Sequence, residues 1–312
     1  MVYDLIIVGG GPAGLSAAVY AGRSILNTLI IEKKFFGGRL KDTAEIVNYP
    51  SVISSSGIAL VEDFRKHASS YTTNNFIYGT VVEICKDEHE DVFEVKTLRK
   101  GTFKAKSVIL ALGTESRVLG IEGEERFQGQ GVSYCATCDA NFFSGKDVHI
   151  LGSGDVALEE ADYISKFANH VTVIVLHDDG IVDGNETQKR IVFDNPKISF
   201  MWNSSLDKII GEDCVNQIVV KNLKTGEKKT VLSDGVFLFV GLKPQTDIVN
   251  GLCKMNSDGF IIVDEKKETS VSGLFAAGDC THTYLRQVVS AVSDGAVAAV
   301  AAERYIRRKE KI

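Results

Sequence analysis

The chain has 312 residues, enough for two domains of ordinary size that each bury a hydrophobic core. Its formal net charge of -6 argues against non-specific nucleic-acid binding, because neutralising phosphates requires a basic surface. No apolar run approaches the roughly 20 residues of a membrane span and no basic leader precedes the first strand, so we expect a cytoplasmic protein. Four widely spaced cysteines predict reduced thiols rather than a secreted disulfide framework: Cys85, Cys214, Cys253 and Cys280.

The first chemical signal is a glycine-rich turn at residues 9–14, between an apolar strand and a helical stretch. It fits G-x-G-x-x-G, in which Gly9 allows the tight turn, Gly11 lets the backbone approach a pyrophosphate and Gly14 lets helix and strand pack closely. The second strand ends in Glu32, about 20 residues after the first glycine, where a carboxylate accepts hydrogen bonds from ribose hydroxyls. The strand, turn, helix and acid together predict dinucleotide binding.

The region between this motif and residue 114 gives structural signals and little chemistry. Its expected elements are an irregular stretch at 35–50, an amphipathic helix at 58–69, strands within 77–95 broken by a solvated acidic turn, and a buried strand at 107–114. We expect that last strand to close the first half of the first domain.

Two cysteines in C-x-x-C spacing, Cys135 and Cys138, are followed at once by Asp139. Thiols at this spacing can close a small disulfide, and a helix start or a nearby cation would lower the pKa of the first thiol. Asp139 is placed by sequence to carry a proton to or from the second sulfur. The alternatives are half of a zinc site or two ordinary thiols, but the sequence has no second C-x-x-C or H-x-x-x-H pair to complete a zinc site. We therefore expect redox use of this pair.

A second cycle of strand, glycine turn and helix begins at residue 147. The strand at 147–151 leads into G-x-G-x-x-A at 152–157, and a helix continues to 168. His149, inside this strand, is expected to be a packed histidine and not a catalyst. Two nucleotide-type folds therefore lie in one chain.

The second fold lacks the chemistry expected at the end of its next strand, 171–175. Val175 stands where an acid would bind an NADH ribose, and no arginine follows to hold an NADPH 2'-phosphate. Asp178 and Asp179 come late enough that we interpret them as loop residues.

The last third of the chain supplies one further candidate, Asp279, which a short strand delivers at a helix start, a place suited to a ribose or a polyol chain. The other expected elements are short antiparallel strands within 198–239, a linker at 241–244, a strand at 260–264, a long buried helix at 289–305 and a solvated basic end at 307–311.

Along essentially its whole length the sequence resembles the low-molecular-weight thioredoxin reductases, which are two-domain FAD flavoproteins. The resemblance is carried by residues 9–14, Glu32, residues 37–38, Asn48 with Pro50, residues 135–139, residues 152–157, residues 276–279 and Arg286 with Gln287. It implies an α/β fold of two Rossmann-like (three-layer ββα) nucleotide-binding-type domains, the second inserted into the first. Residues 1–116 and 243–312 would form the FAD-binding domain, and residues 117–242 an NAD(P)H-domain-like insertion that carries the C-x-x-C. A homodimer is also implied.

The resemblance also implies roles for individual residues. Cys138 would face the flavin, Cys135 would attack the partner disulfide, and Asp139 would be the acid/base; no metal is expected. The residues expected at the FAD are Gly9, Gly11, Pro12, Ala13, Gly14, Glu32, Gly38, Arg39, Leu40, Asn48, Ala111, Gly113, Gly278, Asp279, Arg286, Gln287 and Val288.

Departures from the family bear on the electron donor. NADPH-using members end the second strand of the second fold in His-Arg-Arg with another arginine four positions on, and an ungapped count places Val175, Leu176, His177 and Ile181 there. Near the flavin, Arg39 replaces a glutamine and Leu112 replaces a threonine. The pattern is similar to the ferredoxin-dependent flavin thioredoxin reductases, although the intact glycine turn at 152–154 speaks against that assignment.

These features predict an enzyme that passes electrons from FAD through Cys138 and Cys135 to thioredoxin, with ferredoxin rather than NADPH as donor. One alternative is an NAD(P)H-dependent thioredoxin reductase with an altered nucleotide site. Others are an O2-dependent dithiol oxidase and a flavin-binding redox regulator.

Overall fold

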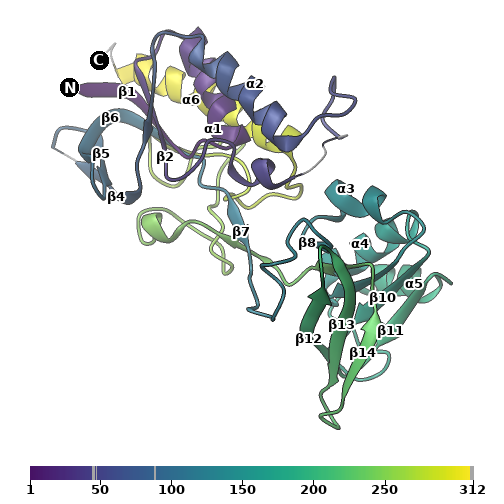
Figure 1. The fold of residues 1–312 in the computed structure, drawn as a ribbon. Helices are drawn as coiled ribbons and strands as arrows, with labels where there is room; N and C mark the ends of the chain where they lie inside the picture. Colours follow the sequence, from purple (N-terminus) through teal and green to yellow (C-terminus); the bar gives the residue numbers. More distant parts are fainter. Residues whose placement is uncertain (44–45, 47, 88, 310–312) are drawn as a thin grey trace. The chain divides into compact units, whose positions relative to one another are not determined.

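The computed structural model describes residues 1–43, 46, 48–87 and 89–309 (Figure 1). The chain folds into two compact units. The first unit contains Met1–Asp42, Tyr49–Glu115 and Lys243–Ile312, and the second contains Thr43–Asn48 and Ser116–Leu242. Where the chain passes between them, two short strands, β7 (Thr114–Ser116) and β16 (Leu242–Pro244), pair with each other.

The first unit is built on a seven-stranded sheet in which β17 joins β6 beside the path β3-β2-β1-β6-β5-β4. Strands β3, β2, β1, β6 and β17 pair in parallel, and β4 and β5 add an antiparallel ribbon. The strands are β1 (Val2–Val8), β2 (Thr28–Glu32), β3 (Asn74–Tyr78), β4 (Val81–Asp87), β5 (Val92–Thr97), β6 (Gly101–Leu110) and β17 (Leu274–Ala276).

The continuous apolar run of β1 is explained by burial of both faces of the sheet. Leu5 and Ile7 pack with the helices α1 (Pro12–Arg23) and α6 (Val288–Lys309), whereas Ile6 and Val8 pack with residues of the antiparallel strands. Full burial of each such side chain stabilises the fold by roughly 1.5 to 3 kcal/mol. The result is a helical layer, a parallel sheet and an antiparallel layer, as the three-layer ββα fold requires.

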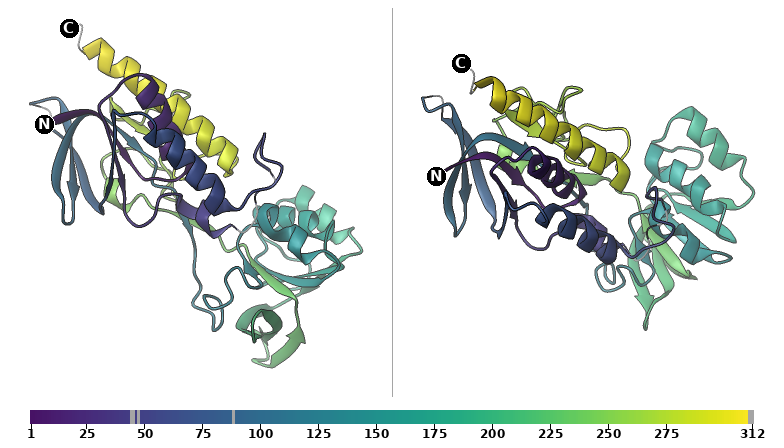
Figure 2. Two further views of the ribbon diagram at one scale, coloured as in Figure 1. Left: turned by 45° about the horizontal axis from the view of Figure 1, so that its top comes forward. Right: turned by 90° about the horizontal axis from the view of Figure 1, so that it is seen from above.

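Helices α1 and α6 lie side by side, as Figure 2 shows, with α2 (Gly57–Ser69) next to α1. Small side chains make this close packing possible: a Cβ atom added at Gly295 of α6 would lie 2.0 Å from the carbonyl oxygen of Ala13. The short helices η1 (Gly38–Asp42) and η3 (Asp247–Val249) complete the first unit.

The second unit repeats the plan with a five-stranded parallel sheet in the order β11-β10-β9-β15-β8. One face packs against helices α4 and α5, and the other against the antiparallel sheet β12-β13-β14. The elements are β8 (Val132–Ser133), α3 (Ala136–Asp139), η2 (Ala140–Phe143), β9 (Asp147–Leu151), α4 (Asp155–Ser165), β10 (His170–Ile174), α5 (Glu186–Phe193), β11 (Ile198–Met201), β12 (Ser204–Gly211), β13 (Val215–Asn222), β14 (Lys228–Leu232) and β15 (Gly235–Leu238).

Three expected elements differ from the structure, the first being the linker at 241–244, which contains strand β16. The strand predicted at 260–264 is wrong: Ile261 makes only isolated bridges, to Met255 and Thr281, and neither neighbouring segment extends the pairing into a ladder. The last helix is longer than predicted, since α6 continues to Lys309. Among the described residues, no helix is long and apolar enough to cross a membrane.

Candidate active site

The two C-x-x-C sulfurs form a disulfide between Cys135 and Cys138, with the two Cα atoms 5.4 Å apart. Cys135 follows β8 and caps the short helix α3, which contains Cys138 and Asp139. Both cysteines are half-buried. The disulfide therefore lies just after the end of the strand, at the start of the short helix. The other four cysteines are free thiols, as the sequence predicted.

Burial raises the pKa of the Asp139 carboxyl above its usual value, and a hydrogen bond from the Ser133 hydroxyl opposes this rise. Ser133 Oγ donates to Asp139 Oδ2 over 2.6 Å. The Ser133 hydroxyl thus holds the carboxyl that the sequence predicts to be the acid/base residue.

The segment before the disulfide is anchored by Glu124, which is 1% exposed. Its carboxylate accepts hydrogen bonds from the backbone N–H groups of Leu119 and Ile121 and, over 2.8 Å, from the Tyr134 hydroxyl. Burial and this acidic partner raise the pKa of Tyr134, so the hydroxyl remains a donor. Sequence reasoning missed both Glu124 and Ser133, since neither stands in a recognisable spacing to the residue it contacts.

The first glycine turn has room for a ligand at one glycine and none at the other two. A Cβ atom added at Gly9, whose φ is +107°, would lie 2.1 Å from the Ala111 carbonyl oxygen, and one at Gly14 would lie 1.9 Å from the Gly9 oxygen. At Gly11, by contrast, the nearest atom is the Gly38 Cα at 3.9 Å. Gly11 caps α1 without any side-chain hydrogen bond, so the turn and helix start can receive a pyrophosphate.

Glu32 lies beside this turn at the end of β2 and is 9% exposed. Its Oε2 accepts a hydrogen bond from the backbone N–H of Gly10 over 2.7 Å, and its Oε1 accepts one from that of Lys34 over 3.0 Å. Each carboxylate oxygen keeps a further lone pair for a hydroxyl donor. The arrangement fits the predicted contact with a ribose.

Three charged side chains meet near Gly278. Burial raises the pKa of Asp279, and Arg39 and Arg286 partly offset the rise. The guanidinium of Arg286 lies 4.2 Å from the centre of the Phe260 ring, while its Nε is buried without a hydrogen-bond partner among the described residues. Because buried donors are nearly always paired, this group points to a missing acceptor. An oxygen-rich ligand such as FAD satisfies that requirement.

The remaining predicted cofactor residues lie in the first unit, with one exception. Leu40 and Ala111 are buried, and Gly113 adopts a φ of +67°. Gln287 lies just before α6, and its backbone N–H donates a hydrogen bond to the hydroxyl of Ser290. Pro12 and Ala13 form the first turn of α1, and Val288 begins α6. Asn48 is the exception, since its segment groups with the second unit.

A buried ion pair supports the Gly278 loop. Lys267 Nζ lies 2.7 Å from Asp294 Oδ1, and the other oxygen of Asp294 accepts a hydrogen bond from the Gly278 N–H over 3.2 Å. The side chains of Lys267 and Asp294 are only 21% and 12% exposed. Removing the lysine would therefore leave a largely buried, uncompensated carboxylate that orients this loop.

We expect Lys267→Met to destabilise the protein by about 2 kcal/mol, which lowers Tm by roughly 5 °C for a domain of this size, and to weaken FAD binding. Scanning calorimetry of the holoprotein and a fluorescence titration with FAD measure the two effects. Lys266→Met is the control, because Lys266 is exposed and makes no ion pair in the described part of the chain. Equal effects of the two substitutions would contradict the role given to the buried pair.

The second glycine turn keeps its backbone shape, but its serine is bonded to an acidic side chain of the following loop. A Cβ atom at Gly152 would lie 2.5 Å from the Phe239 carbonyl oxygen, as expected of a tight turn. Ser153 Oγ, however, donates to Asp183 Oδ2 over 2.7 Å, and the other Asp183 oxygen bonds to His177 over 2.9 Å. A carboxylate thus lies beside the turn that would receive an anionic ligand.

The loop that carries Asp183 is fastened to the start of α4 as well. The backbone N–H and the side-chain amide of Asn185 both donate to Asp155 Oδ1, over 2.6 and 2.7 Å. Two of the positions of the family's arginines hold apolar side chains, Leu176 and Ile181, each 55% exposed, which cannot bind a phosphate. The third holds His177, whose ring bonds to Asp183.

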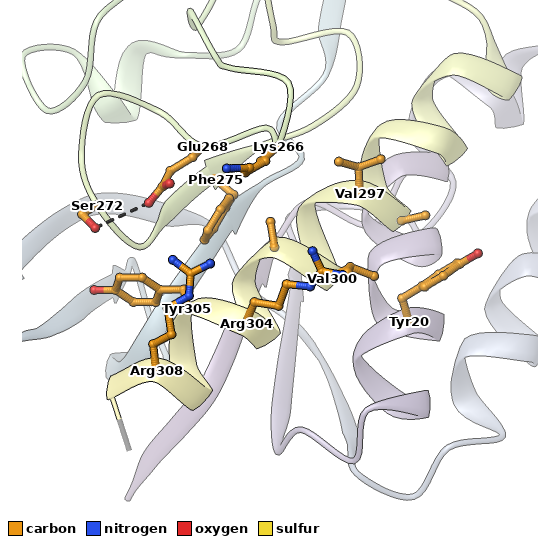
Figure 3. A pocket seen from close by; sticks show the side chains of 12 residues that line it. Tyr20, Lys266, Glu268, Ser272, Phe275, Val297, Val300, Arg304, Tyr305 and Arg308 are labelled. Carbon is orange, nitrogen blue, oxygen red and sulfur yellow. Dashed lines mark hydrogen bonds between the residues drawn. The ribbon is translucent and has the colours of Figure 1, made fainter. Parts of the chain in front are cut away.

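A separate pocket of about 450 Å³ lies in the first unit against α6 (Figure 3). Its lining includes Tyr20, Phe275, Arg304, Tyr305 and Arg308, and no residue of the predicted cofactor or disulfide sites. We assign it no part in the reaction.

Comparison with known proteins places the chain in a family. Residues 3–295 match the model of the pyridine nucleotide-disulphide oxidoreductases. The chain is 41% identical to a thioredoxin reductase of Peptoclostridium acidaminophilum, with 98% of this chain and 97% of that protein aligned. It is 42% identical to a thioredoxin reductase of Treponema pallidum, with 97% of each aligned.

The same similarity holds in three dimensions. The crystal structure of a thioredoxin reductase from Streptococcus pyogenes superimposes with a TM-score of 0.91 at 39% identity, covering 98% of this chain and 99% of that one. The chain therefore belongs to the thioredoxin reductase family of pyridine nucleotide-disulphide oxidoreductases and is an FAD-binding oxidoreductase that acts on a disulfide.

Proposed function

We propose that this protein reduces the disulfide of thioredoxin with electrons that ferredoxin, and not NADPH, supplies to its FAD. Relatives at 41% and 42% identity are named thioredoxin reductases, which supports the acceptor. The observation that carries the choice of donor is the Asp183 carboxylate bound to Ser153 in the second glycine turn.

The cysteine pair in the second unit reduces the thioredoxin disulfide in two steps of thiol–disulfide exchange. In the dithiol form, the Cys135 thiolate attacks a sulfur of the thioredoxin disulfide and forms an intermolecular disulfide. Cys138 then attacks the Cys135 sulfur, which releases dithiol thioredoxin and restores the disulfide seen here. Asp139 accepts the Cys138 proton as that thiol becomes a nucleophile and returns it when the pair is reduced again. FAD, when bound, supplies the electrons that reduce the pair.

In the first unit, the chain's own residues hold the cofactor. The backbone at Gly11 and the start of α1 receive the pyrophosphate, and Glu32 accepts from a ribose hydroxyl. The unpaired Nε of Arg286 donates to an oxygen of the same ligand. These assignments follow from the space at Gly11, the fixed Glu32 carboxylate and the unsatisfied donor.

The case against a nicotinamide donor rests on charge. A 2'-phosphate is normally held by charge-assisted, often bidentate hydrogen bonds from arginines. Here the Asp183 carboxylate lies at the glycine turn, where it accepts a hydrogen bond from Ser153. Two like charges at short range repel, so this loop disfavours the phosphates of NADPH and NADH alike.

The energetics allow ferredoxin to drive the reaction. With a plant-type ferredoxin near roughly -400 mV and thioredoxin near about -270 mV, two electrons release roughly 6 kcal/mol. The competing candidate is an NAD(P)H-dependent reductase, which the open space at Gly154 favours, since a Cβ atom there would meet nothing within 4 Å.

Anaerobic stopped-flow mixing distinguishes the donors. We expect reduced ferredoxin to bleach the flavin absorbance and millimolar NADPH or NADH to leave the flavin oxidised over many seconds. Thioredoxin added afterwards should reoxidise the flavin only in the ferredoxin reaction. Bleaching by either nucleotide at an ordinary turnover rate would return the protein to the NAD(P)H-dependent reductases. The homodimer implied by the resemblance stays a prediction, which sedimentation of the holoprotein tests.

A further inference from the structure

Ser133 links the two ends of the segment that contains the redox disulfide. It is the last residue of β8 and is only 4% exposed. Its Oγ donates to Asp139 Oδ2 over 2.6 Å and accepts from the backbone N–H of Cys135 over 3.1 Å. One hydroxyl thus contacts the residue after Cys138 and the backbone of Cys135.

We propose that Ser133 is a positioning residue, whose hydroxyl holds the Asp139 carboxyl in place next to the disulfide. The inference rests on the proposed role of Asp139 in moving the Cys138 proton. Ser133 itself touches neither sulfur, so it acts through Asp139.

The backbone pairing of Ser133 supports its hydrogen bond to Asp139. Ser133 pairs in register with Phe237 of β15, and this pairing attaches its backbone to the sheet of the second unit. Asp139, in contrast, lies at the end of a four-residue helix that has little stability of its own. A hydrogen bond from a strand of the sheet to the end of this short helix therefore restrains the position of the Asp139 carboxyl.

No other side chain replaces this contact. Among the described residues, Asp139 forms no ion pair and its carboxyl accepts no second hydrogen bond from a side chain. The pKa of Asp139 is raised by burial and lowered by Ser133. A hydroxyl that donates to a carboxylate stabilises the ionised form, so its loss raises the pKa further.

Charged groups on the neighbouring elements do not substitute for this bond. Helix α4 packs against α3 and carries four acidic residues. Three of them have partners elsewhere: Asp155 with Asn185, Glu159 with Gln188 and Asp162 with Lys166. The fourth is Glu160, whose pKa burial raises to about 7. The short helix η2 and strand β15 carry no ionisable side chain. None of these groups alters the pKa of Asp139.

The test uses the holoprotein with its disulfide intact. Carbon-13 NMR of protein labelled at aspartate carboxyls follows the Asp139 titration, and the signal is assigned by its absence in Asp139→Asn. We expect Ser133→Ala to raise the titration midpoint by about one pH unit, the scale of one hydrogen bond to a charged group. Ser133→Thr keeps a hydroxyl and should keep the midpoint near that of the unaltered protein.

Ser165→Ala is the matched control, because Ser165 is equally buried at 4% and donates to a backbone carbonyl, that of Asp162, rather than to Asp139. It should leave the midpoint unchanged. An unchanged midpoint in Ser133→Ala would overturn the proposal, as would a midpoint in Ser133→Thr raised as far as in the alanine variant.

A second readout separates this inference from the proposed function. Holoprotein reduced with dithionite is mixed with thioredoxin disulfide, and the rate of thioredoxin reduction is measured as a function of pH. The pH profile of this rate should move to higher pH in Ser133→Ala. In the Asp139→Asn background, Ser133→Ala should no longer change the profile. If thioredoxin is not reduced at all, the proposed function fails while the NMR titration still decides the role of Ser133. A rate lowered equally at every pH, with an unmoved titration, would mean that Ser133 serves only stability.

Discussion

Replacing either cysteine of the disulfide should abolish thioredoxin reduction, with a loss on the order of 10³-fold or more, the scale on which removal of a covalent nucleophile acts. The reason is that the two sulfurs have separate roles, since one attacks the partner disulfide and the other resolves the intermolecular disulfide. Steady-state turnover of Cys135→Ser and Cys138→Ser measures the loss. Cys214→Ser is the control, because Cys214 is an exposed free thiol of the same unit and should leave turnover unchanged.

The two variants should differ in what they accumulate. Cys138→Ser leaves Cys135 free to attack, so it should form a stable intermolecular disulfide with a thioredoxin that carries a single cysteine activated by thionitrobenzoate. Cys135→Ser should not, but it should show a long-wavelength charge-transfer absorption band between the Cys138 thiolate and oxidised FAD. Absorbance spectra and non-reducing gels record both outcomes. The reverse pattern would exchange the roles of the two cysteines.

The second large effect is expected at Gly11. A glutamate there finds open space, since the nearest atom to an added Cβ is 3.9 Å away, so the first unit should still fold. Its side chain would nevertheless occupy the approach to the α1 helix start and add a charge of the same sign as a pyrophosphate. We expect Gly11→Glu to be purified without flavin, with its far-UV circular dichroism retained. Absorbance of the purified protein in the visible flavin band measures the flavin content.

Gly154→Glu is the matched control for this prediction. Gly154 caps α4 as Gly11 caps α1, and an added Cβ there also meets nothing within 4 Å. Because the proposed function leaves the second turn without a nucleotide, this variant should keep its FAD and its ferredoxin-dependent activity. Flavin loss in both variants, or in neither, would be inconsistent with FAD bound at the first turn alone.

The sequence alone determined the features that depend on neighbouring residues. The two glycine turns, the acid at the end of β2, the C-x-x-C with its aspartate and the apolar periodicity of most strands and helices each lie within a short segment. Backbone geometry then leaves few alternatives, because a tight turn needs glycine at Gly9 and a small disulfide needs the spacing of Cys135 and Cys138. For this reason the two nucleotide-type folds and the redox use of the cysteine pair could be predicted from local patterns, and the resemblance to a family added the three-layer architecture.

Only the tertiary structure decided which distant side chains meet. The bond from Ser133 to Asp139, the ion pair of Lys267 with Asp294 and the bond from Ser153 to Asp183 join side chains that no local pattern connects. The strand wrongly predicted at 260–264 failed for the same reason, since Ile261 finds only isolated backbone partners. A strand exists only where another strand offers its backbone groups, and a buried carboxyl takes its proton affinity from the donors and charges that folding places around it.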